Sequence, residues 1–376
     1  MRRAGFLLPV LLLLAACGGS AANAQDRPFQ VEEIGRFDEP WAMTFLPGGD
    51  LLVTEKRGAL KLRRADGRVL DVAGVPRVSY GGQGGLGDVV LHPDFAHNRL
   101  VYLSWAEAGD NGTRGAVVGR ARFSFGESGP GLSDLQVVWR QLPKIDGGNH
   151  FSHRIAFGPD GKLYISSGER FQFAPAQDLT VNLGKVVRLN DDGSLPPDNP
   201  YANRGGIAAQ VWTLGHRNLL GLAFDGGGRL WEVEMGPMGG DEVNLIQRGR
   251  NYGWPRASNG SNYDGSDIPD HRPGDGFEPP RVWWNPSISP SSLIIYSGAM
   301  FPQWRGDAII GALSGEALIR VHLNGETASK ADRWPMGTRI REVEQAPDGA
   351  VWLLQDGPSG GRLLRLTPRQ GDQATR

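Results

Sequence analysis

Short apolar stretches separated by turns of the Pro-Asp-Gly type recur along the chain. Two apolar runs joined by a turn rich in glycine, proline and aspartate predict a β-hairpin, and no long segment has convincing helical periodicity. About six copies can be recognised, at residues 43–53, 89–103, 155–165, 222–231, 301–310 and 343–353. We therefore expect an all-β protein.

One hairpin cannot bury both of its faces, and a β-propeller solves this problem by repeating the hairpin at a blade-like interval. The copies predict a six-bladed β-propeller over residues 39–368, preceded by an N-terminal segment, 25–38, and followed by a polar tail, 369–376. Uneven spacing between copies predicts long inserted loops, which usually form the walls of a site on one face of the scaffold. These loops are expected at residues 126–148, 190–206 and 251–284. A β-sandwich with coincidental turns is the alternative fold.

The first residues have the pattern of an export signal, with Arg2 and Arg3 ahead of an apolar run. We expect a signal peptide within residues 1–24, cut either after Ala24 or, as the slightly favoured alternative, before a lipidated Cys17. Both predict export to the periplasm, and the second adds a lipid anchor in the outer membrane. Because Cys17 is the single cysteine, the fold cannot rely on disulfides.

Composition and charge narrow the class of protein further. The 55 glycines, 26 prolines and abundant aromatic residues are typical of a turn-rich protein whose strands are packed by large side chains. The 40 Lys and Arg residues nearly balance the 41 Asp and Glu residues, so no global field attracts nucleic acid or an acidic membrane. An anionic ligand must therefore be met by cations placed locally.

Two loops ahead of predicted hairpins carry candidate chemistry. His150 precedes the third copy, where a neutral imidazole could remove a hydroxyl proton, although a lone loop histidine is more often structural. His150 and His153 have no cysteine or carboxylate at zinc spacing, which disfavours a zinc site. Arg217 and Asn218 precede the fourth copy and offer hydrogen-bond donors to a carbonyl-rich anion, or else form a turn with a salt bridge.

Two later segments add oxygen ligands and cations. The turn at Gly236 and Pro237, together with Glu242, offers oxygens to a calcium ion, or forms an acidic capping turn. Strand alternation places Arg339 and Arg341 on the same face, where they could meet an anion or simply face solvent.

Two common enzyme classes are disfavoured by their missing motifs. The glycine-rich run 81–86 lacks the strand, the helix and the acidic follower of a dinucleotide fingerprint. The chain also contains no Gly-x-Ser-x-Gly elbow, which disfavours a serine hydrolase.

Taken in order, these motifs form a specific set. Gly-Gly-Gln-Gly-Gly-Leu precedes His-Pro-Asp-Phe, Gly-x-His precedes Arg-x-x-x-Gly-Pro-Asp-Gly, and Gly-His-Arg-Asn and Met-Gly-Pro-x-Gly-Gly-Asp-Glu follow. From about Glu39 to Pro368 the chain resembles the pyrroloquinoline quinone (PQQ)-dependent aldose sugar and soluble glucose dehydrogenases, also called glucose/sorbosone dehydrogenases. The resemblance implies four-stranded antiparallel blades and a cofactor cleft near the central axis. It also implies PQQ- and calcium-dependent oxidation of aldoses at the anomeric carbon to lactones.

The resemblance also implies a role for each matching residue. His150 matches the general base, with Arg217 beside it as the second catalytic residue. PQQ contacts are implied for Gln83, Arg217, Asn218, Tyr263, Ser314, Arg339 and Arg341. A catalytic calcium is implied at Gly236 and Pro237, and a structural calcium at Glu242 and Tyr252.

Two positions depart from the family pattern. Asn149 stands where glucose dehydrogenases carry an aspartate, and we expect this change to lower the pKa of His150 and to weaken its orientation. Ser314 stands where they carry a lysine, which removes one cation near PQQ.

The expected partners are an aldose and an electron acceptor, either a quinone or a cytochrome, and the protein is expected to be a monomer or dimer. Two alternative functions stay open at this point. One is a calcium-dependent propeller lactonase or esterase, and the other is a propeller that only binds glycans or proteins.

Overall fold

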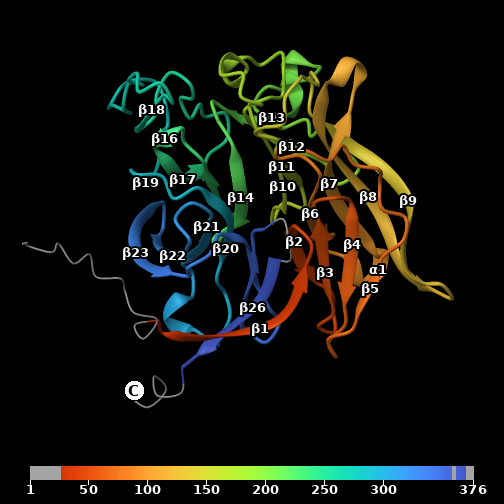
Figure 1. Ribbon diagram of the computed structural model, residues 1–376. Helices are drawn as coiled ribbons and strands as arrows, with labels where there is room; N and C mark the ends of the chain where they lie inside the picture. Colours follow the sequence, from red (N-terminus) through yellow and green to blue (C-terminus); the bar gives the residue numbers. More distant parts are fainter. Residues whose placement is uncertain (1–26, 358–360, 370–376) are drawn as a thin grey trace, which may run out of the picture.

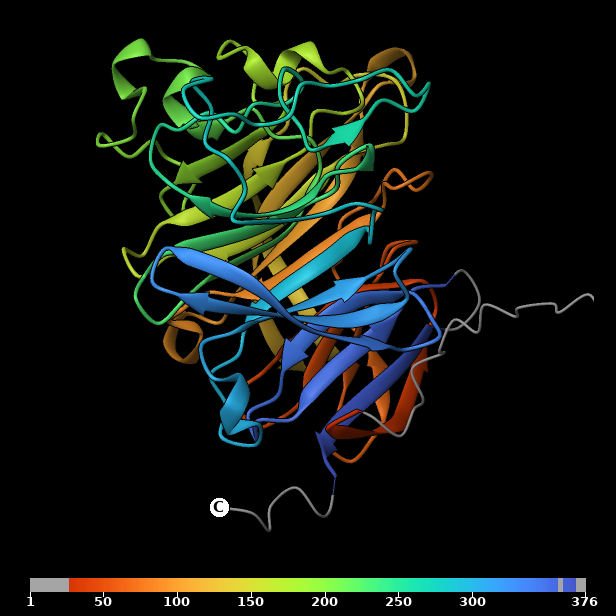
Figure 2. The ribbon, with the colours of Figure 1, turned by 90° about the vertical axis from the view of Figure 1, so that its left-hand side faces the viewer.

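The computed structural model describes residues 27–357 and 361–369, and it confirms the six-bladed β-propeller. Six four-stranded antiparallel sheets follow one another around a central axis (Figure 1, Figure 2). The predicted signal peptide, Cys17 and most of the polar tail lie outside the described residues. Within the part of the chain that the structure describes, no helix is long and apolar enough to cross a membrane.

The first five blades are each formed by consecutive segments. Blade one comprises β2 (Pro40–Phe45), β3 (Leu51–Glu55), β4 (Ala59–Arg63) and β5 (Val69–Asp71). Blade two comprises β6 (Leu86–Leu91), β7 (Leu100–Ala108), β8 (Arg114–Gly126) and β9 (Gly129–Arg140), with the short helix α1 (Phe95–Asn98) between its first two strands. Blade three comprises β10 (Ser152–Phe157), β11 (Leu163–Ser167), β12 (Lys185–Leu189) and β13 (Val211–Leu214).

The fourth and fifth blades complete the series. Blade four comprises β14 (Leu219–Phe224), β15 (Leu230–Glu234), β17 (Asp241–Ile246) and β19 (Val282–Trp284). Its long loops carry a small two-stranded sheet of β16 (Met238–Gly239) and β18 (Gly260–Ser261). Blade five comprises β20 (Pro290–Ile295), β21 (Ala308–Ala312), β22 (Ala317–Asn324) and β23 (Thr327–Pro335).

The sixth blade closes the ring by joining the two ends of the chain. It comprises β24 (Ile340–Gln345), β25 (Val351–Gln355), β26 (Gly361–Pro368) and, as its outer strand, β1 (Phe29–Phe37). β1 lies beside β26 (Figure 1). Their register runs from Phe29 opposite Pro368 to Phe37 opposite Gly361. The propeller thus includes most of segment 25–38, which the hairpin pattern alone had left outside it.

Five of the six predicted hairpins join the first two strands of a blade. The exception is 301–310, because the first strand of blade five is β20 and the apolar residues after 301 form a 3₁₀ turn, Pro302–Trp304, ahead of β21. The expected loop at 126–148 is also wrong in large part, since β9 occupies most of it as the partner of β8. Residues 190–206 contain no strand, and 251–284 contain only β18 and β19.

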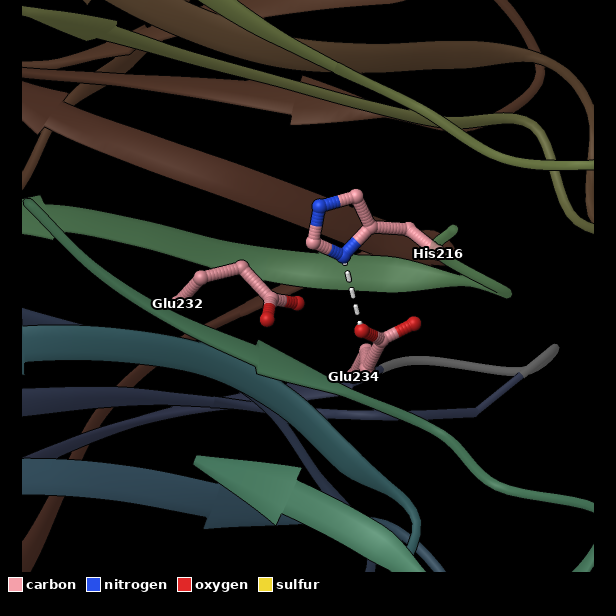
Figure 3. A group of neighbouring side chains, drawn as sticks. All are labelled: His216, Glu232 and Glu234. Carbon is pink, nitrogen blue, oxygen red and sulfur yellow. Dashed lines mark hydrogen bonds and ion pairs between the residues drawn. The ribbon is translucent and has the colours of Figure 1, made fainter. Parts of the chain in front are cut away.

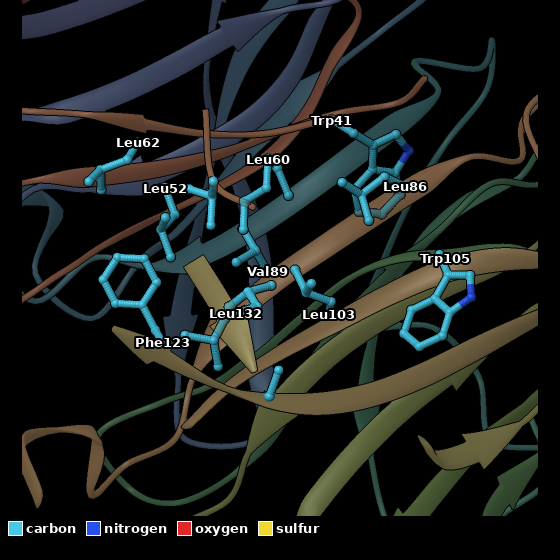
Figure 4. Close-up of a cluster of buried hydrophobic side chains, with 14 of the residues drawn as sticks. Trp41, Leu52, Leu60, Leu62, Leu86, Val89, Leu103, Trp105, Phe123 and Leu132 are labelled. Atoms are coloured by element: carbon cyan, nitrogen blue, oxygen red, sulfur yellow. The ribbon is translucent and has the colours of Figure 1, made fainter. Parts of the chain in front are cut away.

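Adjacent blades are held together by apolar side chains from their facing surfaces. The largest of these clusters lies between blades one and two and contains Trp41, Leu52, Leu103, Trp105 and Phe123 (Figure 4). Burying such side chains contributes about 1.5–3 kcal/mol each relative to leaving them exposed. Interblade packing therefore fixes the relative positions of loops that are far apart in the sequence.

Arg154 joins all six inner strands at the central axis. It extends from β10, is 4% exposed, and its Nη2 donates a 2.6 Å hydrogen bond to Glu342 Oε2 on β24, 188 residues away. Its other partners on inner strands are the Trp41 ring, Asp88 Oδ1, the Leu220 carbonyl and the Ser291 carbonyl. We name this set of contacts the Arg154 hub. A buried charge is tolerated only when it is paired in this way, so we regard the hub as structural.

Candidate active site

His150 lies in a loop held against blade two just ahead of β10. Its backbone N–H donates to Gln83 Oε1 at 2.7 Å, and the Gln83 N–H donates to the Gly148 carbonyl at 2.7 Å. His150 has a positive φ of 49°, which a residue other than glycine adopts only when its surroundings enforce it. The two loops singled out at Gln83 and His150 therefore form one unit.

A carboxylate that the sequence analysis missed orients the imidazole. Glu169 Oε1 lies 2.5 Å from His150 Nδ1, and the Glu169 carboxylate also accepts the N–H groups of Phe171 and Phe173. A proton on Nδ1, shared with Glu169, leaves Nε2 with a free lone pair that can accept a proton. The orienting group in this chain comes from the loop after β11, and the expected effect of Asn149 stays a prediction.

The electrostatic surroundings keep His150 neutral. Burial lowers its pKa, the hydrogen bond to Glu169 opposes that shift, and the nearby positive charge of Arg217 adds to it. The imidazole is therefore available as a base at neutral pH. His153 differs in role, because it is fully buried, stacks on Trp41 and bonds to Ser104 Oγ, and burial lowers its pKa to about 3.

The side chain of Arg217 extends from the loop ahead of β14 towards the Gly236-Pro237 turn. Its N–H donates to Glu234 Oε2 at 2.6 Å, and its Nη1 donates to the Gly236 carbonyl at 2.7 Å. Its Nη2 donates to Tyr263 Oη at 3.1 Å, and its guanidinium lies over the Trp254 ring. Among the described residues, Arg217 Nε is buried without a hydrogen-bond partner.

Aromatic rings connect His150 to Arg217. Phe171 lies 5.2 Å from the His150 ring and 6.1 Å from the Tyr263 ring, measured between centroids. Tyr263 is 59% exposed, and a hollow of about 230 Å³ lies between Phe171, Phe173, Arg217, Pro237 and Tyr263. The His150 imidazole and the Arg217 guanidinium thus lie on either side of a partly exposed group of aromatic rings, Phe171 and Tyr263.

A cavity of about 360 Å³ lies beside this unit, at one end of the central channel. It is lined by Gln83, Asn218, Arg339 and Arg341, and we name it the Gln83 cavity. Its volume falls in the range of about 300–1,000 Å³ that is common for small-ligand sites. Most of its lining comes from loop ends, and residues with positive φ (Glu39, Ser152, His153 and Ser289) cluster there.

Arg339, just before β24, and Arg341, within it, share the carboxylate of Asp356. Arg339 Nε bonds to Asp356 Oδ2 at 2.8 Å, and Arg341 Nη2 bonds to Asp356 Oδ1 at 2.8 Å. They do point to the same face, as the alternation predicts, but they are not free cations. Ser314 lies at the exposed rim, where its Oγ is 2.8 Å from Ser289 Oγ.

The Gly236-Pro237 turn is rich in carbonyl oxygens. A Cβ added to Gly236 would lie 2.2 Å from the Gly239 carbonyl oxygen and 2.5 Å from that of Gly240. The Gly236 carbonyl bonds to Arg217, but a carbonyl oxygen has a second lone pair. Oxygen ligands of this kind suit calcium, so the turn fits the ion if a ligand completes its coordination.

A buried acidic cluster lies beneath the turn. The side chains of His216, Glu232 and Glu234 lie close enough together for one atom of each to bind the same metal ion. His216 Nδ1 is 2.9 Å from Glu234 Oε1 (Figure 3). Asn244 Nδ2 donates to Glu232, Glu234 and also Glu242. Burial and the charge of Glu234 raise the pKa values of Glu232 and Glu242.

Tyr252 takes part in this region mainly through its ring. The ring stacks on His216 at 4.6 Å, and the hydroxyl donates to the Leu245 carbonyl and accepts the Gln247 N–H. Its hydroxyl is therefore fully used, and only its backbone carbonyl remains for a metal ion.

Sequence reasoning assigned no role to Glu169, Glu234 and Asp356, although Glu234 is the last residue of the second strand of its blade and the other two follow such a strand within two residues. That end of the second strand lies beside the start of the inner strand, because the two pair antiparallel, as Ser152 with Ser167 shows. A carboxylate just after a predicted second strand is therefore a signal that could have located the partners of His150 and Arg217.

Comparisons with known proteins agree with the motifs. A sequence model of the glucose/sorbosone dehydrogenase family matches residues 37–365. The aldose sugar dehydrogenase YliI of Escherichia coli (strain K12) is 40% identical over 376 residues, which cover 98% of this chain and 99% of that protein.

Solved structures give the same result. The apo-form of the soluble aldose sugar dehydrogenase from Escherichia coli is 41% identical with a TM-score of 0.86, over 91% of this chain and 100% of that chain. The PQQ-bound form of an aldose sugar dehydrogenase from Streptomyces coelicolor is 31% identical with a TM-score of 0.76, over 91% of this chain and 98% of that chain.

Proposed function

The chain belongs to the glucose/sorbosone dehydrogenase family, and from this we propose that it uses PQQ and calcium to oxidise aldoses at the anomeric carbon. The observation that carries the proposal is the imidazole of His150, held by Glu169 next to Arg217 and beside a cavity with cationic side chains. A solved relative with PQQ bound supports the choice of cofactor.

PQQ is a flat tricarboxylate with carbonyl groups, and the described residues fit such a molecule. The Gln83 cavity has a suitable volume and offers Asn218, Arg339 and Arg341 as donors. Asp356 shared between the two arginines orients them and leaves further N–H groups of each free to donate. The oxygens of the Gly236 and Pro237 carbonyls would hold the calcium ion, and PQQ oxygens would complete its shell.

When bound, PQQ supplies the acceptor for the two electrons and the hydrogen that leave the anomeric carbon. His150 Nε2 takes the proton of the anomeric hydroxyl, while Glu169 holds the ring and stabilises the imidazolium that forms. Arg217 places positive charge where negative charge develops, and the products on the sugar side are a lactone and a proton. Base catalysis of this kind contributes about 100- to 10,000-fold.

The remaining roles are proposals of the same kind. Tyr263 forms part of the wall above Arg217, and Ser314 forms part of the cofactor rim. Glu242 and the backbone carbonyl of Tyr252 would hold a structural calcium next to the buried acidic cluster. The N-terminal pattern supports export, and a quinone or cytochrome would take the electrons from the reduced cofactor.

Reconstitution tests the proposal. The purified apoprotein is mixed with PQQ and calcium, and reduction of an artificial dye is followed with several aldoses. Sugar-dependent dye reduction that requires PQQ is expected. Ester or lactone hydrolysis without PQQ would instead support a calcium-dependent hydrolase, and absence of both activities would favour a protein that only binds glycans or proteins.

A further inference from the structure

Lys56 is a cation in the Gln83 cavity that none of the roles above uses. It follows β3, and its backbone is fixed at both sides, because its N–H donates to the Glu39 carbonyl at 3.0 Å and its carbonyl accepts the Leu86 N–H at 2.9 Å. Its side chain lines the same cavity as Gln83, Asn218, Arg339 and Arg341. Lys56 therefore lies at the cavity wall, on a backbone that is fixed in place.

The neighbouring charges are already paired, but Lys56 is not. Among the described residues, Lys56 Nζ has no carboxylate within 4.0 Å and no hydrogen bond, and its recorded contact is the Tyr80 ring at 5.5 Å. Arg57 next to it is different, because Arg57 Nε lies 3.0 Å from Glu39 Oε2. Burial lowers the pKa of Lys56, as expected for a half-buried cation without a partner.

The charge balance of the cavity depends on this lysine. Three cationic side chains line the cavity, Lys56, Arg339 and Arg341, against two carboxylates, Glu39 and Asp356. These five groups carry one net positive charge, and without Lys56 they would carry none. A ligand with several carboxylates needs such an excess, because an anion brought into a neutral cavity loses hydration without compensation.

Ser314 explains why this cation matters in this chain. It stands where the family pattern has a lysine, and its hydroxyl can only donate to or accept from neighbours such as Ser289. Ser314 follows the second strand of blade five, the arginine pair is in blade six, and Lys56 follows the second strand of blade one. Lys56 therefore flanks the arginine pair from the side opposite to Ser314.

We propose that Lys56 is a cofactor-binding residue that pairs with a carboxylate of PQQ and takes over the charge lost at Ser314. The proposal rests on the proposed function, in that PQQ is the ligand of the Gln83 cavity. It requires only reversible binding, with no covalent or redox step. Residue 56 and residue 314 then become alternative positions for one cation at the rim of the same site.

Direct titration of the apoprotein with PQQ in the presence of calcium, followed by absorbance, tests this assignment without measuring turnover. Lys56→Gln should weaken PQQ binding about tenfold to a hundredfold, which is the range for one lost charge-assisted contact. Lys56→Arg should retain most of the affinity. Lys162→Gln, in the β10–β11 turn and outside the cavity, is the matched control and should bind PQQ like the unaltered protein.

The double variant Lys56→Gln/Ser314→Lys sharpens the test, because a lysine restored at position 314 should recover much of the lost affinity. Raising the salt concentration should weaken binding more in the unaltered protein than in Lys56→Gln, since exposed charge contacts are screened. Thermal unfolding of each apoprotein checks that the variants are folded.

The outcomes separate the two proposals. If the unaltered protein binds PQQ and Lys56→Gln binds it equally tightly, the assignment of Lys56 is overturned while the proposed function stands. If the unaltered protein does not bind PQQ at all, the proposed function is overturned and the assignment of Lys56 with it.

Discussion

The central channel of the propeller has a cavity at each end, and the two differ in how they are built. The Gln83 cavity measures about 360 Å³ and is lined mostly by loop ends. The other, which we name the Glu344 cavity, is larger, at about 440 Å³, and nearly all of its lining residues belong to the six inner strands. The Arg154 hub lies between them.

The comparison indicates that volume alone would not have pointed to the proposed cofactor site. Regular strands hold the Glu344 cavity open, and its described lining has carboxylates at Asp88, Glu342 and Glu344 but no residue with positive φ outside glycine. The end with the Gln83 cavity instead has residues with positive φ, an oriented histidine nearby and cations. Strain of this kind persists only where surrounding structure enforces it, and such positions cluster at functional sites.

The largest expected effect comes from removing the base. His150→Ala should lower kcat of sugar oxidation by about 100- to 10,000-fold, because proton abstraction loses its acceptor, while PQQ still binds. Steady-state dye reduction and a PQQ titration measure the two quantities. Glu344→Gln at the opposite cavity is the control and should keep normal turnover. Near-normal turnover in His150→Ala would refute the assigned role.

Removing the residue between the cavities should affect folding. Arg154→Met leaves the carboxylates of Asp88 and Glu342 without their buried partner, which typically destabilises a protein by about 3–5 kcal/mol. Unfolding in denaturant should show a lower midpoint for this variant. A change below about 1 kcal/mol would mean that the hub contributes little to closing the ring.

Replacing Glu169, the carboxylate that orients His150, should lower kcat by an intermediate amount and should also shift the pH profile of the reaction. Glu169→Gln should lower kcat by about ten- to a hundredfold, the range found when the partner that orients a metal-binding imidazole is removed. Glu169 raises the pKa of His150, so its removal should move the acidic limb of the rate profile to lower pH. A pH series of kcat/KM distinguishes this result from simple loss of folded protein, and an unshifted limb would contradict the assignment.

The smallest expected effect on sugar oxidation comes from the Glu344 cavity, where a substitution should change stability alone. Burial raises the pKa of Glu344 to about 8 from an ordinary value of 4.5. The folded state then holds a proton that the unfolded state releases, so the stability linked to this group is complete below about pH 4.5 and declines as the pH rises to about 8. Glu344→Gln should make the stability of the protein fall less steeply across this window without changing sugar oxidation. Glu342, whose pKa is also raised to about 8 by burial, keeps part of the slope. Denaturant midpoints at several pH values measure the slope.

Local pattern was sufficient for most of the fold. Five of the six hairpins could be located because apolar runs and a tight turn lie within about a dozen residues. Blade five failed because β20 and β21 are separated by a long connection whose own apolar residues, such as Phe301 and Trp304, pack into the core. The loops carrying His150 and Arg217 could be placed for the same reason, since each immediately precedes an inner strand.

The partners of the site residues were beyond local pattern. Glu169 lies only 19 residues from His150, but its role depends on the antiparallel pairing of β10 and β11. Asp356 pairs with Arg339 and Arg341 from the end of the next strand, so its one negative charge offsets one of the two positive charges that alternation alone had suggested. The net charge of a site depends on which side chains form ion pairs, and strand register decides which side chains can meet.

The sequence by itself determined the β-hairpin repeat, the likeness to a sugar dehydrogenase family and the order of the loops that carry His150, Arg217 and the Gly236 turn, because each depends on residues close together in the chain. Only the tertiary structure decided that β1 closes the ring, that Arg154 joins six strands and that Lys56, which has no hydrogen bond or ion pair among the described residues, lies in the same cavity as the arginines. These contacts bring together residues up to about 190 positions apart, as for Arg154 and Glu342, and blade packing alone fixes them.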